Sequence, residues 1–414
     1  MKTEKPEREW YIMNRRDVYR TIYEGGTPDR FPIQGIWPWG ETLERWYSEG
    51  LESGRDAHEA LGLVGDDVLP LPLDLNMVPR YPIQVVAEDD RYITLVDEFG
   101  VTKKIFREDF LLTEGKMVNA GLSSSMSLWL DYPVKDLATW KKVYEERFQP
   151  RLVGRVPGNW DECKVEFKRQ SETRWVSFFC FPLFGLFGPL RQLMGFERLL
   201  FAMAGDDPDL VDTMINDLTD FWLTVFDKML VDVRLDEVTF FEDIASTQSL
   251  LVSPAMFDRF LVPGYRKMIS SLLEMGVKYF FIDSDGNIRR LIPNMLRCGI
   301  TGIVPVEVSA GMDVAHLRLD FPALILNGGI DKKALTHGPE AIETELSRYF
   351  SVAWQLGRCV PRLDHSAPPD ISWSNAQYFA KRYIEYCKAE PVLIKEPRPW
   401  TVFLTERLGS FYGN

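Results

Sequence analysis

The chain has 414 residues, 45% hydrophobic and 26% charged, a balance typical of a globular protein with a sizeable core. Its net charge of −13, from 61 acidic and 48 basic residues, argues against a nucleic-acid-binding protein, which needs a basic surface to neutralise phosphates. No apolar stretch is long enough for a membrane span, the charged N-terminus lacks a secretory signal's apolar core, and the five cysteines are scattered. These features predict a cytoplasmic protein with reduced thiols.

The first 150 residues predict a mixture of short elements. We expect a helix at 13–23, a first strand at 31–37 and a helix ending at Tyr47. Three β-prone runs separated by acidic and glycine-containing turns then predict a small antiparallel meander. The runs are 83–87, 92–96 and 101–106; residues 114–135 are predicted to be irregular and 136–148 helical.

From Arg174 onward the pattern becomes strand, loop, helix. The predicted strands are 175–181, 238–241, 279–282, 302–304, 323–326 and 359–363. The predicted helices between and after them are 190–203, 208–231, 254–274, 288–296, 313–319, 339–354 and 372–388. No Gly-x-Gly-x-x-Gly turn follows any strand, which disfavours a dinucleotide-binding sheet. The pattern predicts a (β/α)8 TIM barrel as one domain over 1–414, with 1–150 as an N-terminal elaboration that includes the first strand and 170–390 as the main βα repeats.

Polar residues follow the predicted strands where each strand ends. The C-terminal ends of barrel strands surround a single pocket, so these side chains are expected to meet there. The residues concerned are Phe181, Glu242, Asp243, Asp283, Asp285, Glu307, Asn327, Asp331, Lys332, Asp364 and His365. So much negative charge in one pocket would be costly without a bound cation or a positive substrate.

Asp283 and Asp285 are the first candidates for a metal or acid–base site. Spaced two residues apart, they would share one face of a continuing strand. Several plain alternatives stay open beside this interpretation. Glu242-Asp243 could cap a loop, Asp285-Gly286-Asn287 could be an ordinary turn, and His365 could be a structural histidine.

An aromatic run from Trp175 to Phe187 exceeds what one strand face needs. It could be a buried strand with a packed loop. It could equally form an apolar wall over the pocket, with Phe181 and Phe184 as substrate contacts, suited to an aromatic or tetrapyrrole-like surface. Trp37 and Trp39, at the end of the predicted first strand, would extend this wall.

Taken together, several stretches resemble the uroporphyrinogen decarboxylase superfamily, a group of (β/α)8 barrels, over nearly the whole chain. The match is specific as a set and weak for any single piece. The stretches are residues 27–32 (Thr-Pro-Asp-Arg-Phe-Pro), Glu242-Asp243, Ser253-Pro254 with Phe257 and Pro263, 283–287 (Asp-Ser-Asp-Gly-Asn), Pro305 with Glu307, 328–332 (Gly-Gly-Ile-Asp-Lys), and Pro368-Pro369-Asp370 with Asn375.

The superfamily has two main branches, and the resemblance is closer to the corrinoid-dependent methyltransferases than to the true decarboxylases. True uroporphyrinogen decarboxylases bind their acidic substrate through N-terminal arginines, whereas this chain has residues 37–41, Trp-Pro-Trp-Gly-Glu, in the comparable region. The methyltransferase branch carries a zinc motif of His-x-Cys and a later Cys. Those positions fall on Asp283, Asp285 and His365, a harder ligand set that zinc tolerates.

The resemblance therefore implies a metal-assisted methyltransferase that moves a methyl group between a small substrate, possibly aromatic, and a corrinoid protein. Asp283, Asp285 and His365 would hold a divalent metal, zinc first among the candidates and manganese or iron after it. Of the expected catalytic residues, Glu242 would be a fourth ligand or a general base, and Glu307 and Lys332 would orient the substrate or neutralise charge. The expected substrate contacts are Trp37, Trp39, Phe181, Phe184, Asn327 and Asp331. The corrinoid would be carried by the partner, because the chain has no Asp-x-His-x-x-Gly motif. A metal-free decarboxylase and a non-catalytic barrel subunit stay open as alternatives, as does a homodimer.

Overall fold

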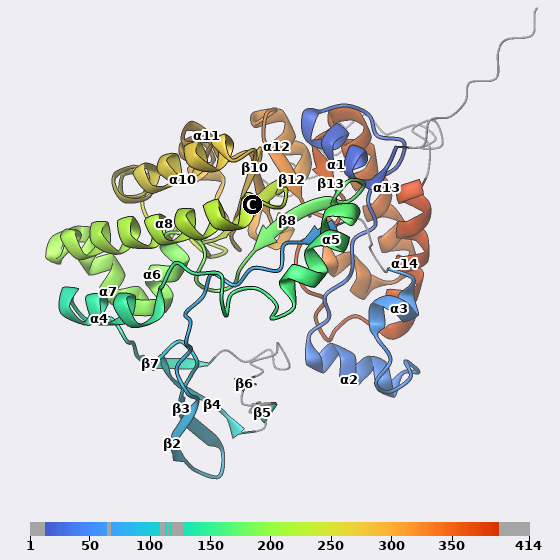
Figure 1. The fold of residues 1–414 in the computed structure, drawn as a ribbon. Helices are drawn as coiled ribbons and strands as arrows, with labels where there is room; N and C mark the ends of the chain where they lie inside the picture. The colour runs from blue at the N-terminus through green and yellow to red at the C-terminus, as the bar shows by residue number, and fades with distance from the viewer. Residues whose placement is uncertain (1–12, 64–67, 108–111, 114–115, 118–126, 389–414) are drawn as a thin grey trace, which may run out of the picture.

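The computed structural model describes residues 13–63, 68–107, 112–113, 116–117 and 127–388. Its centre is a curled sheet of seven strands, in the order β1-β8-β9-β10-β11-β12-β13, in which every neighbouring pair is parallel (Figure 1). The strands are β1 (Val68–Pro70), β8 (Trp175–Phe179), β9 (Glu237–Phe241), β10 (Tyr279–Asp283), β11 (Gly302–Val304), β12 (Ile325–Asn327) and β13 (Cys359–Val360). The predicted barrel class is confirmed.

The predicted first strand at 31–37 is wrong. Those residues form no strand, and the segment after them makes one isolated parallel bridge, between Pro38 and Ala367, outside the seven strands of the sheet. Pro32 and Pro38 lack the N–H groups that a strand would donate to its neighbour. The first strand of the barrel is instead β1, three residues long and too short to give a sequence pattern.

Helices cover the outside of the sheet, and most lie within a few residues of the predicted ranges (Figure 1). The predicted helix at 190–203 is divided at Gly195, whose positive φ of 85° ends α6 before α7 begins. The helices are α1 (Arg15–Glu24), α2 (Gly40–Ser48), α3 (Ala57–Leu61), α4 (Leu137–Arg147), α5 (Trp160–Ser171), α6 (Phe187–Met194), α7 (Phe196–Phe201), α8 (Pro208–Leu230), α9 (Pro254–Met256), α10 (Val262–Glu274), α11 (Ile292–Cys298), α12 (Val314–Asp320), α13 (Pro339–Leu356) and α14 (Trp373–Lys388).

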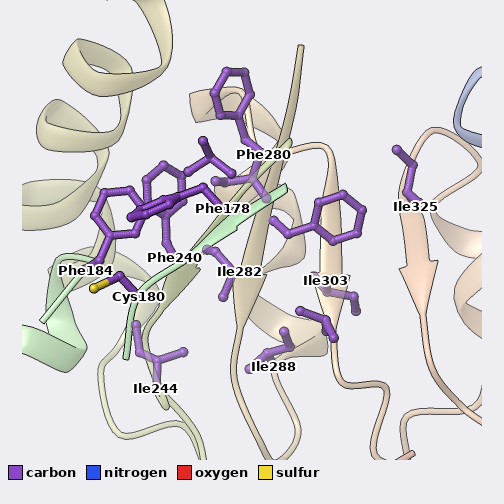
Figure 2. Close-up of a cluster of buried hydrophobic side chains, with 14 of the residues drawn as sticks. Phe178, Cys180, Phe184, Phe240, Ile244, Phe280, Ile282, Ile288, Ile303 and Ile325 are labelled. Atoms are coloured by element: carbon purple, nitrogen blue, oxygen red, sulfur yellow. The ribbon is translucent and has the colours of Figure 1, made fainter. Parts of the chain in front are cut away.

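The core lies between these helices and the sheet. Figure 2 shows side chains of the central strands, among them Phe178, Phe240, Ile282 and Ile303, packed into one cluster. All four are at most 1% exposed. Strands covered on both faces need nearly continuous apolar sequence, which is why β9 and β10 consist mainly of aromatic and branched residues. Burying each such side chain contributes about 1.5–3 kcal/mol, so the strands hold the polar residues at their ends in fixed positions.

The predicted meander is confirmed and gains a fourth strand. It forms a separate antiparallel sheet in the order β2-β3-β4-β7, called here the small sheet, which projects below α4 and α6 in Figure 1. Strand β7 lies in a segment predicted to be irregular. The strands are β2 (Gln84–Glu88), β3 (Tyr92–Val96), β4 (Thr102–Phe106) and β7 (Leu128–Asp131), with a separate two-stranded pair, β5 (Leu112–Thr113) and β6 (Lys116–Met117).

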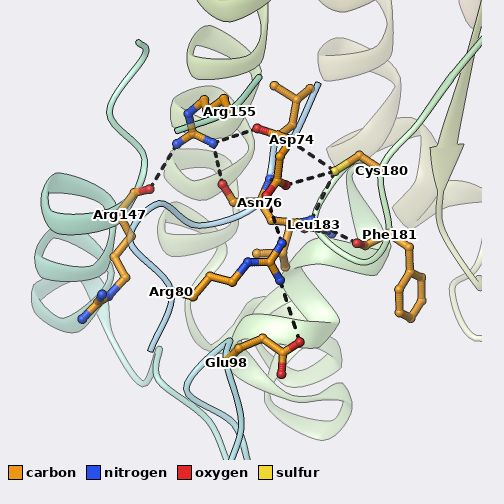
Figure 3. Close-up of polar contacts among 10 residues, drawn as sticks. Asp74, Asn76, Arg80, Glu98, Arg147, Arg155, Cys180, Phe181 and Leu183 are labelled. Atoms are coloured by element: carbon orange, nitrogen blue, oxygen red, sulfur yellow. Dashed lines mark hydrogen bonds and ion pairs between the residues drawn. The ribbon is translucent and has the colours of Figure 1, made fainter. Parts of the chain in front are cut away.

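A buried polar network ties the chain leading into the small sheet to the end of β8 (Figure 3). Arg155 donates to the carbonyl oxygens of Asp74 at 3.0 Å and Asn76 at 2.6 Å. The Asn76 amide donates to the Cys180 sulfur at 3.3 Å and to the Phe181 carbonyl at 3.1 Å. These bonds satisfy backbone groups that would otherwise be buried without partners, and they fix the small sheet beside the barrel mouth.

Candidate active site

One cavity of about 1050 Å³ opens at the C-terminal ends of the barrel strands. The ends of β9, β10 and β11 and the segment after β13 form one side, and residues of the small sheet and the segment after it form the other. This volume is at the upper end of what small-molecule sites occupy. The position is the one that barrel enzymes use for chemistry.

The three predicted metal ligands all line this cavity. Asp283 is the last residue of β10, Asp285 lies two residues beyond it, and His365 follows β13. The prediction that these distant parts of the chain meet is therefore confirmed, although their roles stay predictions.

Asp283 is in the more enclosed setting of the two aspartates. Burial, and then the nearby carboxylates of Asp285 and Asp243, raise its pKa to about 7, while Arg362 and His365 act in the opposite direction. A carboxyl group with such a pKa can hold or release a proton near neutral pH.

Asp285 and His365 form a pair, with 3.3 Å between the carboxylate Oδ2 and the imidazole Nε2. The hydrogen bond that the ring of His365 donates to Asp285 is the main reason why the pKa of His365 is raised. The turn after Asp285 also has a structural role: Gly286 has a φ of 77°, and a Cβ there would lie 2.5 Å from the Ser246 carbonyl oxygen. The turn interpretation of this segment is therefore confirmed, and Asp285 also lines the cavity, while its metal or acid–base role stays a prediction.

Glu242 lies outside the cavity. Its carboxylate accepts hydrogen bonds from the backbone N–H groups of Leu186 and Phe187, both at 2.6 Å, and of Gly188 at 3.1 Å, and also from the Tyr265 hydroxyl. Three backbone donors at the start of α6 thus share one buried anion, as helix N-termini favour. The predicted catalytic role of Glu242 stays untested, and its placement favours anchoring of α6.

Asp243, the next residue, does line the cavity, and sequence reasoning gave it no role. Its φ of 49° is unusual for a residue other than glycine and turns its side chain toward Arg191 of α6. The Arg191 Nη2 to Asp243 Oδ2 distance is 2.8 Å. Arg191 also lines the cavity, although it comes from a helix where no strand-end rule could point to it.

Charge in the cavity is more evenly balanced than the sequence predicts. Arginines and a lysine stand beside most of the carboxylates: Arg191 pairs with Asp243, Lys103 with Asp97, and Arg362 interacts electrostatically with Asp283. The argument that the acidic groups need a bound cation is therefore weaker than it was from the sequence, because the chain supplies cations itself.

The other predicted site residues lie outside this cavity's lining. Glu307 accepts from the Gly286 N–H at 2.9 Å, so it supports the turn that carries Asp285. Lys332 lies 3.8 Å from the buried Asp364, and Asp331 caps the following turn by accepting from the Lys333 N–H. The Asn327 Oδ1 is buried and has no hydrogen-bond partner.

The predicted aromatic wall divides into two groups. Phe184 is fully buried in the core, as is most of the run, whereas Phe181 is 61% exposed and lines the cavity beside Phe241, with ring centroids 4.7 Å apart. Trp37 is 57% exposed and packs edge-on against His58, and Trp39 is the residue before α2; neither lines the cavity.

Comparison with known proteins now adds to this geometry. The uroporphyrinogen decarboxylase family model matches residues 187–386, which include α6 and every strand end of the site from β9 to β13. This likeness to the uroporphyrinogen decarboxylase family covers just under half of the chain. A solved methyltransferase from Methanosarcina mazei has a similar fold, with a TM-score of 0.53 at 15% identity over 90% of this chain and 99% of that one. No curated protein matches by sequence.

The zinc that the uroporphyrinogen decarboxylase superfamily resemblance implies can be compared with the residues present. Two zinc ligands at about 2.0–2.1 Å in tetrahedral geometry lie roughly 3.3 Å apart, and the Asp285–His365 pair has this spacing. Within the described part of the chain, however, no group of three His, Cys, Asp or Glu side chains is arranged to hold a metal. The residues as they stand do not form a complete set, and zinc stays a prediction.

Among the described residues, no helix is both long and apolar enough to cross a bilayer.

Proposed function

We propose that this chain is a methyltransferase that moves a methyl group between a small substrate and a corrinoid protein. The observation that carries the proposal is the convergence of Asp283 and the Asp285–His365 pair on one large cavity at the barrel mouth. The methyltransferase of similar fold supports the reaction class, since the fold likeness extends over nearly all of both chains.

The chain's own residues would supply proton control. When the carbon–oxygen or carbon–nitrogen bond of a methyl donor breaks, the departing atom needs a proton, and the Asp283 carboxyl can donate it near neutral pH. Asp285 would keep the His365 ring oriented and favour its protonated form. The corrinoid of the partner protein would supply the methyl acceptor.

A decarboxylase is the second candidate, and the cavity arginines favour it. Arg80, Arg191 and Arg362 line the cavity and could meet the carboxylates of an acidic substrate. Two of them are already held by carboxylates of the chain, Arg80 by Asp74 at 2.9 Å and Arg191 by Asp243 at 2.8 Å. A polycarboxylate would have to displace those partners, so methyl transfer stays the first candidate.

The test uses free cob(I)alamin in place of the partner-bound corrinoid. Purified protein is mixed with 2-methoxyphenol or methylamine, and formation of methylcobalamin is followed by its absorbance under anaerobic conditions. We expect methyl transfer by the native chain and a rate lowered by about a hundredfold in Asp283→Asn, since general acid catalysis contributes about 10²–10⁴-fold. Asp227→Asn, at an exposed position on α8, is the matched control.

Two results would overturn the proposal. Release of CO₂ from uroporphyrinogen, without methyl transfer, would establish the decarboxylase. Absence of both activities in a correctly folded protein, tested with its corrinoid partner present, would favour the non-catalytic subunit.

A further inference from the structure

The barrel supplies only one side of the cavity. The opposite side comes from the small sheet and the residues after it, with Asp97, Lys103, Trp129 and Tyr132 among the lining side chains. An elaboration that only stabilised the barrel would have no need to present aromatic side chains to a cavity.

Trp129 is held by a buried ion pair. It pairs across the sheet with Lys103, whose Nζ lies 4.7 Å from the centroid of the Trp129 ring system. Lys103 in turn lies 2.7 Å from the Asp97 carboxylate, and the two side chains are 7% and 1% exposed. Asp97 also accepts from two backbone N–H groups of its own turn, both at 2.9 Å. One face of the indole is thus fixed against a cation that cannot move away.

Tyr132 fixes this side of the cavity to the barrel. A Cβ at Gly195 would lie 2.5 Å from the Tyr132 ring, so only glycine between α6 and α7 lets the ring approach so closely. The Val134 N–H also donates to the Leu193 carbonyl at 3.0 Å. The rings of Trp129 and Tyr132 have centroids 6.1 Å apart. The small sheet and the residue directly after it therefore present two rigidly held aromatic side chains, Trp129 and Tyr132.

The barrel presents its own rings to the same space. Phe181 and Phe241 form an edge-to-face pair there, and Phe181 is 61% exposed. Leaving so large an apolar surface in water is unfavourable, and an inserted ring would bury it.

We propose that the small sheet is a specificity wall that binds a neutral aromatic ring, with Trp129 and Tyr132 as ring contacts and Lys103 as the residue that positions Trp129. The ring is neutral because Lys103, beside Trp129, and Arg191, which interacts with Tyr132, already have carboxylate partners in the chain. Resting on the proposed function, this inference makes the methyl donor or acceptor an aromatic compound.

The test measures binding alone, without corrinoid or turnover. Isothermal titration calorimetry compares 2-methoxyphenol with 2-methoxycyclohexanol, which has the same substituents on a saturated ring. We expect the native chain to bind the aromatic probe about tenfold more tightly, which corresponds to the upper range of aromatic pair energies. Trp129→Leu abolishes this preference, and Trp129→Phe keeps most of it.

Leu128→Ala is the matched control. Leu128 neighbours Trp129 on β7, is 60% exposed and does not line the cavity, so its removal leaves the preference unchanged. Lys103→Met weakens binding of the aromatic probe more than binding of the saturated probe, because the indole of Trp129 loses its fixed position. Thermal melts check that every variant is folded.

Equal affinities for the two probes in the native chain, or equal effects of Trp129→Leu and Leu128→Ala, would overturn the inference. Aromatic-selective binding without methyl transfer would keep it and overturn the proposed function. Methyl transfer from methylamine without aromatic-selective binding would do the reverse.

Discussion

The two aspartates of the cavity, Asp283 and Asp285, differ in the groups that control their protonation. Asp283 has no described hydrogen bond to its carboxylate and is surrounded by other acids, whereas Asp285 has the His365 ring beside it. Two carboxylates that the sequence presents as equivalent are therefore unlike in the fold. Such a difference is how one site provides an acid and an orienting partner at the same pH.

Replacing Asp283 by Asn should stabilise the protein while slowing its reaction. The raised pKa means that the folded state holds a proton that the unfolded state has lost, so the aspartate lowers stability progressively from pH 3.8 to about 7, and the penalty is constant above that. We expect Asp283→Asn to raise the free energy of unfolding by roughly 1–3 kcal/mol at pH 8 and by much less at pH 4. The gain at pH 8 is smaller than the full pKa shift implies, because Arg362 loses its counter-charge. Urea unfolding at both pH values measures this. An equal effect at both would contradict the assigned environment.

Removing the carboxylate of Asp285 should lower the pKa of His365. The hydrogen bond that the ring donates to Asp285 is the largest cause of the raised pKa, so Asp285→Asn moves the titration of the ring to lower pH. Proton NMR titration of the four histidines measures the pKa of His365, and the variant His365→Gln assigns its signal. The other three histidines serve as internal controls, and a His365 titration that stays in place would show that the pair does not form.

At the scale of elements, the end of β9 shows what sequence reasoning can and cannot reach. The strand and its acidic end were predicted correctly, and alternation along a strand implies that Glu242 and Asp243 face different ways. Which of them lines the cavity depends on α6, a helix more than 40 residues earlier in the chain. The backbone N–H groups at its start donate hydrogen bonds to Glu242. Arg191 was missed for the same reason, because nothing in a local pattern tells which cations a distant helix brings to a site. Arg362 lies within the predicted strand 359–363 and was missed because only residues beyond the strand end were considered.

Glu242→Gln should damage the fold more than the chemistry. An amide can accept at one end only, so a backbone N–H at the start of α6 would face an NH₂ group and lose its partner, at a cost of about 2 kcal/mol. Tyr265→Phe, which removes one donor and leaves the carboxylate in place, should cost less. Chemical denaturation ranks the two variants. A folded Glu242→Gln protein with a changed pH profile of kcat/KM would restore the catalytic role predicted for this residue.

For the whole molecule, the repeat of strands and helices after residue 174 was sufficient to predict the barrel class. Long apolar strands and well-capped helices such as α8 carry strong periodic signals. The N-terminal third is harder, because β1 has three residues and the predicted strand at 31–37 owes its β-like composition to residues that pack without pairing.

Hydrogen exchange should reveal the weakly paired side of the barrel. Strands β9 and β10 have a partner strand on both sides within the sheet, whereas the segment 31–38 makes one isolated bridge outside it. We expect peptides covering 31–38 to exchange at least about a hundredfold faster than those of β9 and β10. Comparable protection would mean that this segment completes a closed eighth strand in solution.

Glu242 and Asp243 are joined by one peptide bond, yet the first anchors the start of α6 and the second lines the cavity. Attempts to change the ligand selectivity of this cavity therefore have to take account of the fold at the same two positions. Varying Asp243 together with Arg191, with Glu242 held constant, is the route by which new variants keep their shape while the selectivity of the pocket changes.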